Sequence, residues 1–177
     1  MEGVGGLSTW LDPMGAEITC QARHVSQREA PQDVAWTLGV GGETHVRIIR
    51  CVWAVDANPA AVSTTYVPGD VAGPLGDPAA GDAETFQAVL HMPLEARPGI
   101  GPVAARAVDL ELAPPQPSVA RSLRLLPGQP AFAVTIRFDD IEAGTPVGLT
   151  MIALKPDQFR VVIHAGDALP SGPHNAD

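Results

Sequence analysis

Few residues of this chain are spaced for catalysis or for metal binding. Cys20 and His24 could hold a metal ion, but a zinc site needs three or four nitrogen or sulfur ligands and no second pair follows. No serine stands in the Gly-x-Ser-x-Gly turn used by many hydrolases. Residues 39–42 (GVGG) precede an extended stretch and not a helix, so they are predicted to form a turn and not a phosphate loop. We therefore expect no metal and no cofactor.

Composition and charge exclude several classes of protein. A hydrophobic fraction of 45% with 18% charged residues is typical of a globular domain, and 177 residues suffice for one sizeable core. No run approaches the roughly 18 apolar residues of a membrane span, and the first ten residues lack a signal-peptide pattern. With only two cysteines, Cys20 and Cys51, a cytoplasmic protein without a membrane partner is expected.

The net charge of −9 argues against direct binding to nucleic acid. Eleven lysines and arginines face 20 acidic residues, and no basic run is present. Binding to phosphates requires clustered cations that displace counterions. The chain by itself is therefore not expected to bind DNA.

The chain repeats one pattern twice. Val34-Ala35-Trp36-Thr37-Leu38 is answered by Val119-Ala120-Arg121-Ser122-Leu123, and each copy continues through a glycine turn, an apolar stretch, a proline-marked turn and a second apolar stretch. The offset between the copies grows from 85 residues at these helices to 88 residues at Pro68 and Pro156. Related halves whose loops have diverged would show this drift. One domain with internal pseudo-symmetry is predicted.

Hydrophobic periodicity supplies the elements of each half. Both faces of the stretch 44–55 are apolar, which indicates a central strand or one that lines an enclosed pocket. Asp139, Asp140 and Glu142 fall in a hairpin turn, where we expect them to be solvated. Strands are predicted over 16–25, 44–55, 60–67, 102–112, 131–138, 147–154 and 159–164, and short helices over 31–38, over 83–92 after Asp82, and after Ser118 as the cap.

These elements predict an α+β fold, with a largely antiparallel sheet, a few short helices and two pseudo-repeated halves. Residues 1–14 are predicted to be an arm or linker, residues 15–165 a single domain, and residues 166–177 a flexible tail. Residues 69–82 are rich in glycine and proline and are predicted to form a surface loop.

The order of these motifs resembles a known family. A helix ending in Ala-x-x-Leu, a glycine turn, a strand, an Asp-x-x-Pro turn and a strand ending in Tyr66-Val67-Pro68 precede a second unit that ends in Pro156-Asp157-x-Phe159. Over about residues 7–165 this order resembles the UTRA domain, the effector-binding and dimerisation half of HutC-type regulators in the GntR family, which has the chorismate lyase-like fold. The resemblance implies transcription regulation through a small-molecule effector, a homodimer, and contact with DNA only through an N-terminal winged helix-turn-helix that is absent here.

The resemblance also implies an effector site. Family members that sense sugar phosphates carry two arginines before the Asp-x-x-Pro turn, and Cys51 and Trp53 hold those positions here. The two glutamate positions hold Ser63 and Met151, and a serine at the start of the middle helix falls at Thr85. The full set of residues expected at this site is Cys51, Trp53, Ser63, Tyr66, Thr85, Arg137, Met151 and Phe159.

Most of the polar positions are therefore replaced by less polar groups, which indicates an apolar and aromatic pocket. Such pockets take their affinity from buried area, at about 25 cal/mol per Å². Thr85, near a helix N-terminus, could accept a carboxylate. We expect an apolar or aromatic effector, with one acid group, instead of a sugar phosphate. Trp53 and Met151 could instead be core residues, and this alternative stays open.

Two other functions remain as alternatives. A lyase of the chorismate lyase type needs cations on two carboxylates and an acid near the ether oxygen, and Cys51, Trp53, Ser63 and Met151 supply none of these. We therefore expect no enzyme. A stand-alone small-molecule-binding protein without a DNA partner is the other alternative, and a helix-turn-helix encoded upstream in the parent gene would exclude it.

Overall fold

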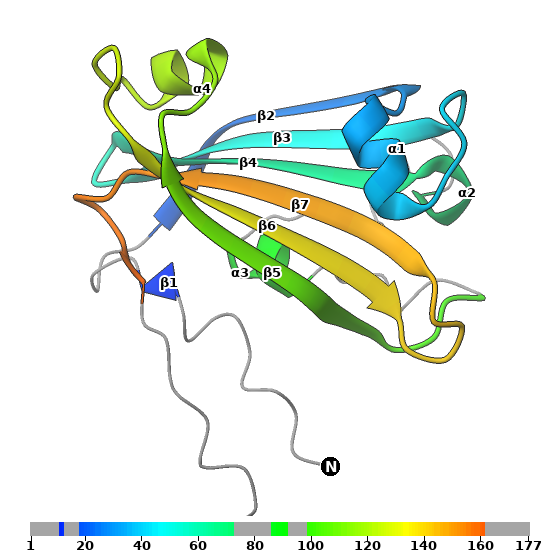
Figure 1. Ribbon diagram of the computed structural model, residues 1–177. Coiled ribbons are helices and arrows are strands. Elements are labelled where there is room, and N and C mark those ends of the chain that lie inside the picture. Colours follow the sequence, from blue (N-terminus) through cyan, green and yellow to red (C-terminus); the bar gives the residue numbers. More distant parts are fainter. Residues whose placement is uncertain (1–10, 13–17, 73–85, 92–98, 162–177) are drawn as a thin grey trace, which may run out of the picture.

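A six-stranded antiparallel sheet is the main element of the structure (Figure 1). The structure is a computed structural model, and it describes residues 11–12, 18–72, 86–91 and 99–161. The sheet runs in the order β2-β3-β4-β7-β6-β5, and β1 pairs separately with β8. The strands are β1 (Leu11–Asp12), β2 (Ile18–Glu29), β3 (His45–Val55), β4 (Asn58–Pro68), β5 (Val103–Ala113), β6 (Ala131–Asp140), β7 (Pro146–Leu154) and β8 (Arg160–Val161). The predicted α+β fold is confirmed.

The helices are short, as predicted, but two of them depart from the expected pattern. They are α1 (Gln32–Leu38), α2 (Gly69–Ala72), α3 (Phe86–His91) and α4 (Pro117–Ser122). The helix α2 lies where we predicted a loop. The cap of α4 is Gln116 and not Ser118, because Pro117 takes the first helical position, where its missing N–H is not needed. No helix among the described residues is long and apolar enough to cross a membrane.

Some predicted features fall outside the described residues, and some elements begin or end at other residues than predicted. The predicted cap Asp82 and residues 166–177 fall outside the described residues. Within the predicted arm, Leu11 and Asp12 form β1. The strand β2 continues to Glu29, four residues beyond Val25, because it stays paired with β3 as far as His45.

The sheet joins the two predicted halves at its centre. One half contains β2, α1, β3 and β4, and the other contains β5, α4, β6 and β7, so that β4 and β7 meet in the middle of the sheet. Thr65 and Thr150, 85 residues apart, face each other across this seam, and their buried hydroxyl groups are hydrogen-bonded at 3.0 Å. The doubled pattern of the sequence thus corresponds to a symmetric order of strands.

Alternation of side chains gives the sheet two different faces. The face that we call the core face carries the larger hydrophobic cluster, with Trp53 of β3, Ile136 of β6 and Leu90 of α3. The opposite face, which we call the groove face, packs against α1 through a smaller cluster that includes Ile48 and Leu149. In Figure 1, α1 and α4 lie on one side of the sheet and α3 lies on the other.

The hairpin turns fit their backbone conformations. Asp56 and Ala57 both have positive φ, at 49° and 64°, which is what a two-residue turn between twisted antiparallel strands requires. Gly39 ends α1 with φ at 65°, in the left-handed region where a side chain is strained. The turn after β3 and the end of α1 at Gly39 were both predicted from the sequence.

The prediction of a solvated acidic turn is wrong for Asp139 and Asp140, which are both buried at the end of β6. The carboxylate of Asp140 accepts hydrogen bonds from the backbone N–H groups of Gly101 and Glu142, each at 2.8 Å, and of Ala143 at 2.9 Å. These N–H groups, that of Ala143 foremost, hold the pKa of Asp140 below its ordinary value. The residue therefore fixes the β6–β7 turn and the segment before β5.

We expect Asp140→Asn to lower the melting temperature at pH 7. Because the folded-state pKa is lowered, the stabilisation by the carboxylate is complete above the unfolded-state pKa, near 3.9, and is lost as the pH falls through the folded-state value. Thermal unfolding of both proteins from pH 7 to about pH 3 should show the difference shrinking. The control Asp157→Asn, at an exposed carboxylate, should change little at either pH. A loss that is independent of pH would contradict this account.

Candidate ligand-binding site

The residues predicted to form one effector site lie on both faces of the sheet. Cys51, Trp53 and Phe159 belong to the core-face cluster, and Ser63 joins them as the direct strand partner of Cys51. On the groove face lie Tyr66, Met151 and Arg137, the last as the strand partner of Leu149. Thr85 falls outside the described residues. No single cavity can therefore contain all seven described side chains.

Met151 shows why counting along the sequence gave this result. An offset of 88 residues matches Ser63 to Met151, but an even offset joins positions on opposite faces, because core-face residues are odd-numbered on β4 and even-numbered on β7. The core-face residue of β7 next to Met151 is Thr150, which is fully buried against Thr65. Sequence analysis missed this polar pair, although the alternation of β7 already carried the signal.

The residues at the family's arginine positions are packed into the core. Trp53 is fully buried, and its indole Nε1 donates a hydrogen bond of 2.8 Å to Oγ of Ser63. The ring of Phe86 meets Trp53 edge-on, with centroids 5.4 Å apart, and Phe159 packs against Phe86 at 5.6 Å. The only indole N–H of this aromatic cluster is therefore hydrogen-bonded to a buried neighbouring side chain. Among the described residues, Trp53 therefore has the contacts of a core residue.

Cys51 is not set up for nucleophilic chemistry. Burial first, and then the neighbouring Cys20 thiol, raise the pKa of Cys51 to about 12. The thiol is protonated at neutral pH, and only the thiolate is a strong nucleophile. On the same face, four positions earlier on β3, Arg47 is also buried, whereas Arg50 lies on the groove face.

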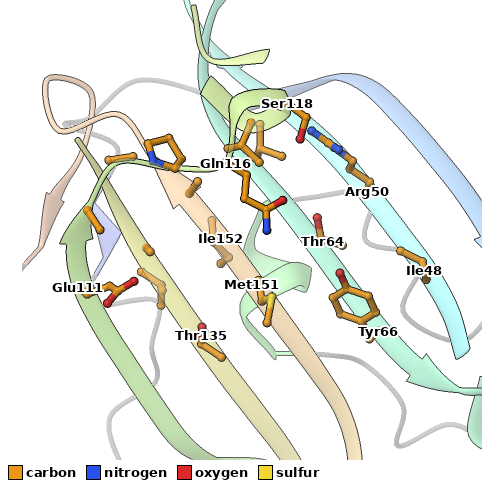
Figure 2. A pocket seen from close by; sticks show the side chains of 18 of the residues that line it. Ile48, Arg50, Thr64, Tyr66, Glu111, Gln116, Ser118, Thr135, Met151 and Ile152 are labelled. Atoms are coloured by element: carbon orange, nitrogen blue, oxygen red, sulfur yellow. The ribbon is translucent and has the colours of Figure 1, made fainter. Parts of the chain in front are cut away.

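A groove of about 680 Å³ lies on the groove face, and its volume falls within the range of small-molecule sites (Figure 2). All six strands of the sheet contribute to its floor, and residues 114–119 at the start of α4 form a wall. Ile48 and Met151 lie on the floor, near Tyr66. The groove therefore combines apolar floor residues with polar side chains.

Charges are distributed unevenly along the groove. His24, Arg28 and Arg50 line it on β2 and β3, whereas Glu111 lines it from β5, at the opposite edge of the sheet. Burial first, and then the carboxylate of Asp33, raise the pKa of Tyr66, and the nearby Arg28 and Arg50 lower it by less. The basic side chains that line the groove are thus gathered at one end, where the Asp33 carboxylate also lies within electrostatic reach of Tyr66.

We expect Trp53→Ala to lower the free energy of unfolding by about 3–5 kcal/mol, because it leaves a large cavity in a packed core. Ser63→Ala should cost about 1–3 kcal/mol, because it leaves the buried indole N–H without its acceptor. Urea unfolding measures both changes. The matched control is Trp36→Ala, since Trp36 is 86% exposed and its loss should cost within about 0.5 kcal/mol. Similar costs for the two tryptophans would contradict the core assignment of Trp53.

Comparison with solved structures shows which fold this is. The ligand-binding domain of a protein assigned as a GntR-family transcriptional regulator from Bordetella bronchiseptica matches with a TM-score of 0.68 at 19% identity, over 88% of this chain and 95% of that chain. The C-terminal domain of the histidine utilization repressor from Pseudomonas syringae pv. tomato matches with a TM-score of 0.67 at 13% identity, over 84% of this chain and 99% of that one.

A longer relative matches in part. The Bacillus subtilis protein YydK matches with a TM-score of 0.66 at 16% identity, over 85% of this chain but only 63% of its own. No curated protein shows significant similarity to the sequence. At these identities the solved structures establish a shared fold, that of the C-terminal domains of GntR-family regulators, which is chorismate lyase-like.

The sequence itself establishes the family. The model of the UTRA domain matches residues 14–160, which include the whole six-stranded sheet, both short helices of the repeated pattern and the groove. The motifs that end in Tyr66-Val67-Pro68 and in Phe159 fall within this match. The chain therefore belongs to the UTRA domain family.

Proposed function

We propose that this chain is the ligand-sensing and dimerisation domain of a GntR/HutC-type transcriptional regulator. Membership of the UTRA family is the observation that carries this proposal, since the matched structures include a ligand-binding domain of a GntR-family protein. Contact with DNA would fall to a winged helix-turn-helix in another part of the parent protein. The chain itself has 11 basic residues against 20 acidic ones and no basic run to displace counterions from DNA.

We propose a small effector with an apolar or aromatic body and one acid group. Supporting this choice, the family's two arginine positions hold Cys51 and Trp53, which have no charge to offer a sugar phosphate. Apolar side chains and cations also occur together in the groove, where Met151 lies on the floor that Arg50 borders. An apolar body gains affinity from buried area, and a single acid group gains orientation from a cation.

We propose no enzymatic step. A lyase of the chorismate lyase type would need two cationic carboxylate sites and an acid beside the reacting ether. Cys51, Trp53 and Ser63 offer none of these groups, and the Cys51 thiol has a pKa of about 12. A sensing role needs only that the ligand bind one state of the domain better than another.

A thermal-shift screen tests the sensing role. We expect aromatic monocarboxylates to raise the melting temperature in a saturable manner, while hexose phosphates of equal concentration do not. A ligand at a hundred times its Kd should stabilise the domain by about 2.7 kcal/mol. Tight, saturable binding of a hexose phosphate would show that the effector class is wrong. Absence of any stabilising compound among aromatic and aliphatic acids would count against the sensing role itself.

Support for a homodimer comes from the edge of the sheet. The strand β5 is an 11-residue edge strand, and its Leu110 and Leu112 are 41% and 58% exposed. A long edge with exposed apolar side chains is a ready template for pairing with another chain. A second copy of the domain, related by two-fold symmetry, would cover this edge, and a palindromic operator would suit such a dimer.

We expect sedimentation to show a dimer at tens of micromolar, and Leu112→Lys to shift it toward monomer by placing a charge in the covered edge. The matched control is Leu126→Lys, at a residue that is 73% exposed in the connection between α4 and β6 and should not affect assembly. A wild-type monomer at this concentration would argue against dimerisation through this domain. Equal weakening by both variants would argue against the β5 edge.

A further inference from the structure

Basic side chains of two neighbouring strands gather at one end of the groove. His24 of β2 lies directly opposite Arg50 of β3, and Arg28 lines the groove farther along β2. The guanidinium of Arg50 has only one hydrogen bond among the described residues, a long one of 3.5 Å to Oγ of Ser122. An anion at this position would give Arg50 a charge-assisted hydrogen-bond partner.

Further hydroxyl groups line the floor of the groove on the strand next to Arg50. Tyr66 is half-buried, and its hydroxyl group makes no hydrogen bond to any described residue. In Figure 2, Thr64 lies between Tyr66 and Arg50 along the floor, and Gln116 reaches over the floor from the wall. Thr64 is also the direct strand partner of Arg50, so both side chains share this face. Polar groups that can fix the orientation of a ligand, beside an apolar surface that can bury its body, are what a small-molecule site offers.

The remainder of the groove would hold an apolar body. Met151 is the strand partner of both Thr64 and Thr135, and it occupies the middle of the floor. Ala133 and Ala153, which also line the groove, are small enough to leave it open on the side of β6. Glu111 lies beyond them on β5 and would repel a second acid group. The groove therefore has one anion-binding end only.

We propose that this groove binds an amphipathic organic acid, with the acid group on Arg50, Tyr66 and Thr64 and the apolar body over Met151. This proposal rests on the proposed sensing function and assigns the ligand site of that function to the groove. The acid is read on the groove face of the sheet, opposite the family positions Cys51 and Trp53, which are packed into the core. Arg50 supplies a charge-assisted hydrogen bond, and the hydroxyl groups fix the orientation of the acid.

The competing occupant of this face is a second copy of the chain. Exposed Trp36 on α1 would be the natural side chain for such a contact, since it is 86% exposed. The charge distribution favours the small acid, because the basic side chains that line the groove lie at one end, on β2 and β3, instead of spreading over the face. Measurement of the assembly state separates the two occupants.

The probe is 2-naphthoate, with 2-naphthamide as its uncharged counterpart of the same shape, titrated calorimetrically into the full chain. We expect naphthoate to bind more tightly than naphthamide. Arg50→Gln should weaken naphthoate about tenfold, the loss of one hydrogen bond to a charged group, and leave naphthamide unchanged. Thr64→Val should weaken naphthoate by less, and Arg121→Gln, on the exposed side of α4, should have no effect.

Three outcomes would overturn the groove site. Naphthoate could fail to bind, it could bind Arg50→Gln as tightly as wild type, or Arg50→Gln could convert a dimer into monomers, which would assign the face to a second copy. Failure of the groove is distinct from failure of the sensing function. An acid found by thermal shift whose affinity survives Arg50→Gln would keep the sensing role and place its site elsewhere. Circular dichroism and the melting temperature of each variant show that it is folded.

Discussion

Side chains on a strand alternate between two faces, and this alternation governs what each residue of the single sheet can do. On β3 it sends Cys51 and Trp53 to the core face and Ile48 and Arg50 to the groove face. The core face is closed by an aromatic cluster that includes Phe86 of α3. The groove face is covered only in part, by α1 and α4, which leaves the floor between them open. Packing on one face and an open groove on the other have the same origin.

The two faces depend on each other mechanically. A site built on strands is positioned more precisely than one on loops, provided that the strands themselves are held. Here the strands of the groove floor are held together on the core face by two buried hydrogen bonds, one between Trp53 and Ser63 and one between Thr65 and Thr150. The buried aromatic and polar contacts of the core face thus fix the spacing of Arg50, Thr64 and Tyr66 on the other face.

Local signals in the sequence predicted most of the fold. Period-two stretches located six long strands, and Gly39 and the Asp56–Ala57 turn were placed correctly, because each depends on a few neighbouring residues. The site was harder to predict, because it depends on whether the odd-numbered or the even-numbered residues of each strand face the groove. A shift of a single residue in the alignment of the two halves moves a side chain to the other face. Met151 shows this effect.

The contacts of charged side chains were equally hard to foresee. The sequence around Asp140 resembles an ordinary solvated turn, and only the fold brings Gly101 close enough to donate to its carboxylate from 39 residues away. The same holds for Arg50, whose neighbours His24 and Thr64 come from other strands. Contacts of this kind depend on strand register, and neither composition nor local periodicity specifies register between distant segments.

The hydrogen bond between Thr65 and Thr150 also has a consequence for how the domain forms. Within each half, strands β3 and β4, or β6 and β7, are joined by short hairpins, so their contacts are local in sequence and require little loop closure. The seam joins residues 85 positions apart, and its pairing must wait for a much larger loss of chain entropy. We therefore expect the hairpins of each half to form before the seam pairs, so that the floor of the groove is completed only when the two halves meet.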